Sequence, residues 1–289
     1  MIGLSNDLKN LTFPVQEGYG AEEIKKAQQV VLDMGRIVCS ILERNEIPYM
    51  ITNGTLIGAA LYQSFVPWDD DFDLFLFDDT YEEAMQALEA ELPAHLIVHS
   101  KKNDPKYFPA WNRVKDIRTY AEDSGLYNPD NRILKFPCLS VDLYRIKRIP
   151  KSRVEFYKIS EALKYFERKH EFGIISSPMY NQEVKLLQQK KSNLEAQPFE
   201  GYDDDVYMFM VMLKRPLSTK DIFPLMRYTF EGHGFYGPQS SDALLSSLYG
   251  EDYKRIPEFE QRNTRFSRVS FFSKPYFDSN GEVSCKYQR

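Results

Sequence analysis

The chain has 289 residues, enough to bury a large core without a disulfide or metal staple. Its hydrophobic fraction of 43% and charged fraction of 27% are ordinary for a globular protein, and the net charge of −5 argues against nucleic acid as a partner. The cysteines Cys39, Cys138 and Cys285 are too widely spaced for a disulfide framework or a paired-cysteine zinc site. The amino terminus lacks a signal-like pattern and no apolar run has transmembrane length, so we expect a cytoplasmic protein, with peripheral membrane proximity left open.

The first half of the chain alternates predicted helices and strands. Apolar residues at three- and four-residue spacings predict an amphipathic helix over residues 21–45. A short strand then leads through Asn53-Gly54-Thr55 into a helix that begins at Thr55. The acidic run WDDDFD opens a buried strand. The predicted elements after the first helix are strands at 47–52, 71–77, 96–100, 107–115 and 138–146, and helices at 55–64 and 81–92.

The second half of the chain differs in composition. From residue 151 to about residue 189 it is lysine-rich and helical, with a break at Ser177-Pro178, which predicts a helical subdomain. A compact region follows, and the charged, aperiodic segment after Glu258 predicts a loosely ordered tail. We therefore expect a core of residues 1–150, helical and C-terminal elements over 151–257 that complete it, and a tail over 258–289.

Four carboxylates in the stretch FVPWDDDFDLFLF lie against an apolar strand. Asp71 and Asp73 are two residues apart on that strand, so their side chains point to one face with Cα atoms about 7 Å apart. Neighbouring buried carboxylates oppose each other's ionisation unless a cation neutralises them. Asp142, on a later strand, supplies a third carboxylate, and oxygen ligands favour Mg²⁺ or Mn²⁺ over zinc.

Two other interpretations of the acidic run are weaker. A solvated acidic turn is the usual fate of a charge run, but here an apolar strand follows directly. A calcium-binding EF-hand loop needs Gly at its sixth position and Glu at its twelfth, where this chain has Leu74 and Thr80. The four histidines fit no catalytic triad or zinc spacing, so we expect them to be structural or exposed.

The order of these motifs predicts the fold class. A strand, a Gly-Thr turn, a helix, an Asp-x-Asp that opens the next strand and a third Asp on a later strand form the layout of the nucleotidyltransferase fold. That layout suits metal-bridged phosphoryl transfer, in which catalysis is mainly positioning and charge neutralisation. We expect an α+β protein with a nucleotidyltransferase-like mixed sheet flanked by helices, and a helical subdomain beside it.

The stretch NGTLIGAALYQSFVPWDDDFDLFLF resembles the signature of the LicD family of phosphotransferases, which includes the phosphocholine transferases of bacterial surface glycans and the fukutin-related proteins. The family carries a Gly-Thr-Leu-Leu-Gly-Ala run that leads, through Pro-Trp-Asp-Asp-Asp, to an Asp-hydrophobic-Asp. The resemblance extends over roughly residues 20 to 257. It includes the segments WNRVKDIRT and SVDLY, and the tripeptides Phe230-Glu231-Gly232 and Leu248-Tyr249-Gly250.

The resemblance implies metal-dependent transfer of a phospho-alcohol, such as phosphocholine, from a CDP-activated donor such as CDP-choline to a hydroxyl of a glycan or glycolipid, with release of CMP. Lipopolysaccharide and teichoic acid are such acceptors. Carried over by motif, the metal ligands would be Asp71, Asp73 and Asp142, and Asp69 would orient or deprotonate the acceptor hydroxyl. The donor phosphates would meet Gly54, Thr55, Arg113 and Lys115.

Two departures from the family pattern concern the donor. Many members carry Arg-His where this chain has Leu61-Tyr62. The family's Asp-Ile-Phe-Pro-Leu-Asp run corresponds to Asp142–Lys147 here, which lacks the second acid of that run. If the alcohol is choline, its ammonium should meet aromatic faces, for which Trp68, Trp111 and Tyr107 are candidates. The alternatives are a nucleotidyltransferase that moves NMP from an NTP with release of pyrophosphate, and a non-enzymatic metal-binding scaffold.

Overall fold

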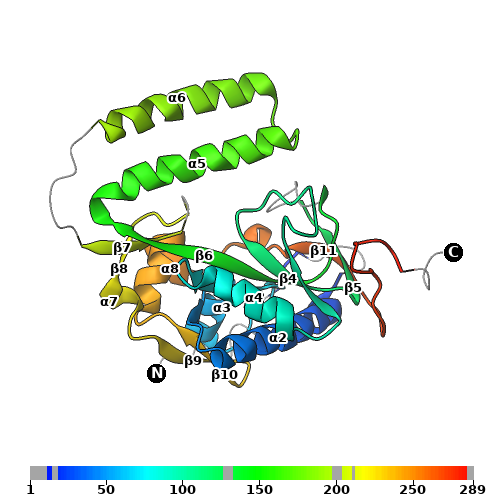
Figure 1. Ribbon diagram of the computed structural model, residues 1–289. Helices are drawn as coiled ribbons and strands as arrows, with labels where there is room; N and C mark the ends of the chain where they lie inside the picture. Colours follow the sequence, from blue (N-terminus) through cyan, green and yellow to red (C-terminus); the bar gives the residue numbers. More distant parts are fainter. Residues whose placement is uncertain (1–11, 15–18, 126–132, 197–203, 210–211, 285–289) are drawn as a thin grey trace.

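The computed structural model describes residues 12–14, 19–125, 133–196, 204–209 and 212–284 (Figure 1). In that part of the chain, seven strands form one mixed sheet in the order β1-β2-β6-β4-β3, with β7 beside β6 and β8 beside β7. Strands β2 and β6 run parallel, and the other pairs are antiparallel. The strands are β1 (Tyr49–Ile51), β2 (Phe72–Phe77), β3 (Leu96–His99), β4 (Asn112–Asp116), β6 (Ser140–Pro150), β7 (Asp205–Met208) and β8 (Leu217–Ser218).

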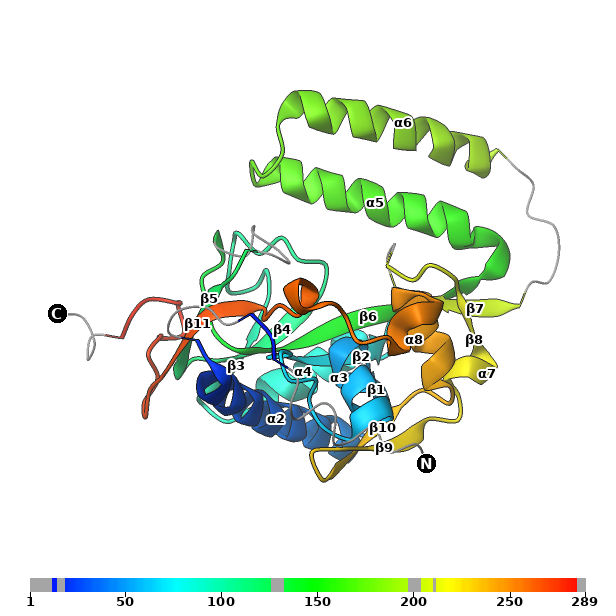
Figure 2. The same cartoon turned by 180° about the vertical axis from the view of Figure 1, so that it is seen from behind.

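Helices flank this sheet, and a hairpin of two long helices stands away from it (Figures 1 and 2). The helices are α2 (Ala21–Arg44), α3 (Asn53–Ile57), α4 (Tyr81–Glu91), α5 (Val154–Glu171), α6 (Ser177–Glu195), α7 (Thr219–Ile222) and α8 (Ser241–Tyr249). Helix α3 continues as a π-helical turn over Gly58–Tyr62. The expected α+β fold with a mixed sheet, flanking helices and a helical hairpin is therefore confirmed. Among the described residues, no helix is long and apolar enough to cross a membrane.

The predicted helices and strands of the first half are present, with shifted ends. The predicted strand over residues 107–115 begins only at Asn112. The helix after β1 begins at Asn53 with Thr52 as its N-cap, so Thr55 lies inside the first turn. The break in the lysine-rich region falls between Glu171 and Ser177, and Pro178 belongs to the first turn of α6, where its missing N–H costs no hydrogen bond.

The segment after Glu258 is more ordered than expected. Strand β11 (Phe266–Phe271) pairs antiparallel with β5 (Thr119–Asp123), which the sequence also did not predict as a strand. The register shifts between Phe266 and Arg268, so a bulge interrupts the alternation of apolar and polar residues that would have revealed β11. The prediction of a loosely ordered tail is wrong for residues 266–271, and Cys285 lies outside the described residues. A further hairpin joins β9 (Met226–Phe230) and β10 (His233–Gly237).

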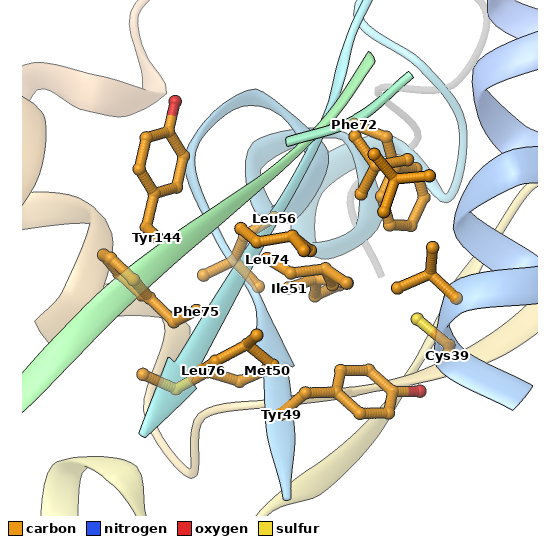
Figure 3. Close-up of a cluster of buried hydrophobic side chains, with 14 of the residues drawn as sticks. Cys39, Tyr49, Met50, Ile51, Leu56, Phe72, Leu74, Phe75, Leu76 and Tyr144 are labelled. Atoms are coloured by element: carbon orange, nitrogen blue, oxygen red, sulfur yellow. The ribbon is translucent and has the colours of Figure 1, made fainter. Parts of the chain in front are cut away.

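The packing of α2 against β2 determines which face of the sheet is free for chemistry. Phe72 lies against Gly35 of α2 so closely that a Cβ on Gly35 would be 2.9 Å from the Phe72 ring. Figure 3 shows Cys39 of α2 on one side of the strands, and Phe75 with Tyr144 on the other. Because side chains alternate along a strand, Asp73 shares the face of Phe75, opposite α2.

We predict that Gly35→Ala destabilises the protein, although alanine normally stabilises the middle of a helix by about 1 kcal/mol relative to glycine. The added methyl forces the Phe72 ring to move, and overpacking of this kind costs about 1–3 kcal/mol. Thermal or urea unfolding measures the change. The control is Ser40→Ala at an exposed position of the same helix, which should change the free energy of unfolding by no more than about 0.5 kcal/mol. Equal stability of the two variants would contradict the packing argument.

Candidate active site

The parallel pairing of β2 with β6 brings together the three carboxylates that the sequence assigned to one site. Asp73 and Asp142 are direct partners in the register of these strands, and both are buried, with exposed fractions of 4% and 2%. Asp71 lies just before β2. The Nη1 atom of Arg265 is 2.8 Å from Oδ2 of Asp71 and 3.3 Å from Oδ2 of Asp142. A guanidinium from the C-terminal segment therefore links two of the three carboxylates.

Asp142 is held ionised by its neighbours. Its Oδ1 is 3.0 Å from Nε of Arg113 and accepts a hydrogen bond from the Ser140 hydroxyl at 3.2 Å. The Trp111 indole N–H and the Tyr144 hydroxyl both donate to Oδ2, each at 3.3 Å. Burial by itself would raise the pKa of Asp142, but the positive charges of Arg113, Arg265 and Lys115 hold that pKa well below its ordinary value.

The negative charge of Asp73 is balanced by fewer positive charges and hydrogen bonds than that of Asp142. Its buried Oδ1 has no hydrogen-bond partner among the described residues, and its backbone N–H donates to Oγ1 of Thr55 at 3.0 Å. Burial, followed by the charges of Asp71 and Asp142, raises the pKa of Asp73 well above its usual range, although Arg265 and a hydrogen bond with Asn53 oppose the shift. A cation bound near Asp73 would therefore be stabilised by negative charge that the described residues only partly balance.

Asp69 is positioned by the glycine of the Gly-Thr turn. A Cβ on Gly54 would lie 2.2 Å from Oδ2 of Asp69, so only glycine leaves room for this carboxylate. That oxygen is buried and has no hydrogen-bond partner in the described part of the chain. Burial, and then the neighbouring charges led by Asp71, raise the pKa of Asp69 well above its ordinary value. Gly54 and Asp69, fifteen residues apart in the sequence, thus form one local unit.

Thr55, Arg113 and Lys115 are all buried. The Thr55 hydroxyl is used by β2, because it accepts the Asp73 N–H. Arg113 pairs with Asp142, whereas the Lys115 ammonium donates to the carbonyl of Cys138 at 2.7 Å. Burial, followed by repulsion from Arg113 and Arg265, lowers the pKa of Lys115 to about 7. The assignment of Thr55, Arg113 and Lys115 to the donor phosphate stays a prediction. The Thr55 hydroxyl would have to contact the phosphate while it also accepts the hydrogen bond from the Asp73 N–H.

A cavity of about 350 Å³ opens beside the carboxylates. Arg113 and Lys115 of β4 and Arg265 of the C-terminal segment line it together with Glu122 and Asp123, so cations from two segments face one space. Such a cavity suits a substrate that carries several negative charges.

Asp70 has a structural role. Its buried carboxylate accepts hydrogen bonds from the Tyr19 hydroxyl at 2.8 Å and from the backbone N–H groups of Arg265 and Phe266 at 2.9 and 3.2 Å. Burial and the Asp71 charge raise the pKa of Asp70 to about 7, despite these hydrogen bonds. The acidic turn therefore fixes the C-terminal segment at Arg265, a site residue that the sequence analysis missed.

The three aromatic candidates for a choline site have different surroundings. Tyr107 is fully buried and its hydroxyl donates to the carbonyl of Trp111 at 2.6 Å, so it belongs to the core. The Trp68 ring lies 5.6 Å from the guanidinium carbon of Arg262 and 6.4 Å from the ring of Phe13. Trp111 is half-buried, donates to Asp142 and lies 5.6 Å from the guanidinium carbon of Arg113. Trp111 is thus the candidate in direct contact with the site.

The donor chemistry of this site fits Mg²⁺ or Mn²⁺. The available groups are carboxylate oxygens, and those of Asp69 and Asp73 include buried atoms without a hydrogen-bond partner. In the conformation described, however, no group of three or more His, Cys, Asp or Glu side chains among the described residues is arranged to hold a metal ion. The Arg265 guanidinium supplies positive charge between Asp71 and Asp142 instead.

Comparison with known proteins locates a family match in the same part of the chain. Residues 46–130 match the family described as LicD/FKTN/FKRP, nucleotidyltransferase domain. Over 102 residues the chain is 28% identical to the lipopolysaccharide cholinephosphotransferase LicD of Haemophilus influenzae, which covers 35% of this chain and 38% of that protein. Over 123 residues it is 27% identical to an uncharacterized protein of Rickettsia prowazekii, which covers 36% of this chain and 45% of that protein.

These matches span less than half the length of either relative. The matched range of residues 46–130 includes Gly54 and the cluster from Asp69 to Asp73, whereas Asp142 and Arg265 lie beyond it. The resemblance seen in the sequence is confirmed, and the structure adds residues from outside the matched range to the same site.

We predict that Arg265→Gln makes the site more responsive to divalent cations. The substitution removes the positive charge between Asp71 and Asp142, so a cation gains a larger electrostatic stabilisation there. Without metal, the variant should unfold at a lower temperature than the wild type. Added Mn²⁺ should raise its melting temperature by more than it raises that of the wild type.

The matched control is Arg268→Gln, an exposed position on β11. It should show the wild-type response to Mn²⁺ in the same melting experiment. If Arg265→Gln responds to Mn²⁺ no more strongly than this control, Arg265 does not compensate the carboxylates in the way described.

Proposed function

The chain belongs to the LicD family, and on that premise we propose that it transfers phosphocholine from CDP-choline to a hydroxyl of a cell-surface glycan, with release of CMP. We propose Mg²⁺ or Mn²⁺ as its cofactor. The observation that carries the proposal is the pairing of Asp73 with Asp142 across the parallel strands, beside Asp71 and Arg265. The Haemophilus relative is a lipopolysaccharide cholinephosphotransferase, which supports phosphocholine as the transferred group and lipopolysaccharide as the kind of acceptor.

The residues around the cavity beside the carboxylates can bind the diphosphate of the donor. Arg265 and Arg113 present guanidinium groups, which bind phosphate oxygens in pairs, and the Lys115 ammonium lies beyond them. A divalent cation held by Asp71, Asp73 and Asp142 would neutralise charge on the phosphate oxygens as the bond to CMP breaks. Arg113, Lys115 and Arg265 would stabilise the charge on CMP as the leaving group, and a metal bound by the carboxylates would add positive charge there.

Asp69 is the residue that we assign to the acceptor. Its raised pKa gives the carboxylate the proton affinity that a general base needs, and Gly54 fixes its position. In this role Asp69 accepts the proton of the glycan hydroxyl while the hydroxyl oxygen attacks the phosphorus of phosphocholine. The bond from that phosphorus to the oxygen of CMP breaks in the same transfer.

Trp111 is the residue that we assign to the choline group. An indole face attracts a quaternary ammonium by about 0.5–2 kcal/mol, depending on how far water is excluded. Since the indole N–H of Trp111 bonds to Asp142, its ring is held next to the carboxylates. A polyol donor would gain nothing from this face, so the preference for choline should depend on Trp111.

The test of the function is an assay of product identity. The purified protein and Mg²⁺ are incubated with CDP-choline, CDP-ethanolamine, CDP-ribitol or CDP-glycerol, with and without lipopolysaccharide, and CMP is measured. We expect acceptor-dependent CMP release, fastest from CDP-choline. Pyrophosphate release from an NTP, with no CMP from any CDP-alcohol, would favour the nucleotidyltransferase alternative and overturn the proposal.

We predict that Asp73→Asn separates activity from stability. The variant loses a charge needed for the metal, so CMP release should fall at least about 100-fold. Its melting temperature in the absence of metal should stay equal or rise, because the buried Asp73 carboxylate has a raised pKa and an unpartnered oxygen. Asp79→Asn, at an exposed position just after β2, is the control and should keep full activity. Full CMP release by Asp73→Asn would contradict the assignment of Asp73 to the metal site.

A further inference from the structure

A second cavity, of about 390 Å³, lies where α5 faces α4 and β6. Figures 1 and 2 show α5 above strand β6 of the sheet. The volume is within the range of cavities that bind small molecules. No residue from Asp69 to Asp73 lines this cavity. It also shares no lining residue with the cavity beside Arg265, so the two cavities are distinct.

The cavity has an excess of positive charge. Three acidic side chains line it, Asp78, Glu82 and Glu161, against six basic ones: Lys101, Lys102, Arg145, Lys147, Lys164 and Arg168. Ion pairs within the protein compensate four of the basic groups. These pairs join Arg145 and Lys147 to Asp78, Lys164 to Glu161, and Lys102 to Glu89, and Arg145 also contacts Glu82.

The two remaining cations, Lys101 and Arg168, have no ion-pair partner among the described residues. Lys101 is exposed at the mouth of the cavity. Arg168 is half-buried, and its Nε and Nη2 atoms are fully buried without a hydrogen-bond partner in the described part of the chain. Burying guanidinium donors without acceptors is unfavourable, and burial lowers the pKa of Arg168. Two donors on one guanidinium match two oxygens of a phosphate.

The rest of the lining suits a sugar. Tyr157 and Phe209 contribute aromatic rings, and Ser100 and Asn112 contribute polar side chains. Aromatic rings and a few polar groups in one cavity give both the apolar contact and the hydrogen bonds that fix a small polar ligand.

The position of the cavity relates it to the carboxylates. The ring centroid of Phe209, which lines the cavity, is 6.3 Å from that of Trp111, whose indole N–H donates to Asp142. The contact between these two rings therefore links the lining of this cavity to the proposed active site. An oligosaccharide bound here is long enough to extend from the cavity toward the carboxylates.

We propose that this cavity binds a phosphorylated sugar of the acceptor glycan, with Arg168 and Lys101 holding the phosphate. The proposal rests on the proposed function, because it assigns the acceptor to a second site of the same reaction. A glycan anchored here by its phosphate presents a different sugar to Asp69, and the donor occupies the cavity beside Arg265.

The test measures binding without turnover. Isothermal titration calorimetry of the full chain, in EDTA, compares inorganic phosphate, glucose 6-phosphate and glucose as probes. Glucose 6-phosphate should bind the wild type more tightly than either other probe. Loss of a charge-assisted pair of hydrogen bonds corresponds to about a tenfold loss in affinity. We therefore expect Arg168→Gln to weaken glucose 6-phosphate binding about tenfold and Lys101→Gln to weaken it by a smaller factor.

Two control variants separate this site from others. Arg148→Gln, at an exposed arginine of β6 outside the cavity, should bind glucose 6-phosphate as the wild type does, and Arg265→Gln reports whether the probe binds at the donor cavity instead. Because Lys101 is exposed, Lys101→Gln keeps the test valid even if Arg168→Gln fails to fold. Wild-type binding in Lys101→Gln and Arg168→Gln, loss of binding only in Arg265→Gln, or equal binding of glucose would each overturn the proposal.

The result is distinguishable from that of the function assay. If no CDP-alcohol releases CMP but the Lys101 and Arg168 variants lose glucose 6-phosphate, the sugar-phosphate site stands and the proposed reaction fails. If CMP is released from CDP-choline but these variants bind glucose 6-phosphate as the wild type does, the reaction stands and the acceptor site fails.

Discussion

Negative charge at the junction of β2 and β6 is the constraint on which the site depends. Parallel pairing sets Asp73 against Asp142, with Asp71 one step away, in a place that water reaches poorly. Arginines from two distant segments form ion pairs with these carboxylates. Arg113 belongs to β4, and Arg265 directly precedes β11. Positive charges and hydrogen bonds balance the charge of Asp142 fully and that of Asp73 only in part. Of these two carboxylates on one face of the sheet, Asp73 therefore keeps more capacity to bind a cation.

Much of the fold followed from local patterns in the sequence, and the part that did not depends on long-range pairing. The helix α2 and the strands β1, β2 and β6 have apolar periodicities that are visible within a few residues. Strand β11 is short, carries a bulge and pairs with β5, more than a hundred residues earlier in the chain. No pattern in the sequence therefore indicated that Arg265 belongs to the site. The segment is held beside the carboxylates by hydrogen bonds from the backbone N–H groups of Arg265 and Phe266 to Asp70, which local patterns do not reveal.

The same distinction applies within the site. The spacing of the acidic motif was enough to predict that Asp71 and Asp73 would share a face, and a later strand supplied Asp142 as the third carboxylate. It was not enough to predict how the Gly-Thr turn works, because that depends on what packs against it. The structure uses Gly54 to admit the Asp69 carboxylate and the Thr55 hydroxyl to hold the Asp73 N–H. Both residues position acids, a role that is indistinguishable in the sequence from direct contact with phosphate.

The two cavities explain how one domain could hold two anionic substrates close together. Like charges repel, and phosphate groups sharing a single pocket would raise the free energy of binding for both ligands. Here the cations are divided, with Arg113, Lys115 and Arg265 on one side and Lys101 and Arg168 on the other. Phe209 lines the cavity at Lys101 and Arg168 and contacts Trp111, which bonds to Asp142. On the proposed function, the separate cavities keep the two phosphates apart while only the attacking hydroxyl comes near the phosphorus.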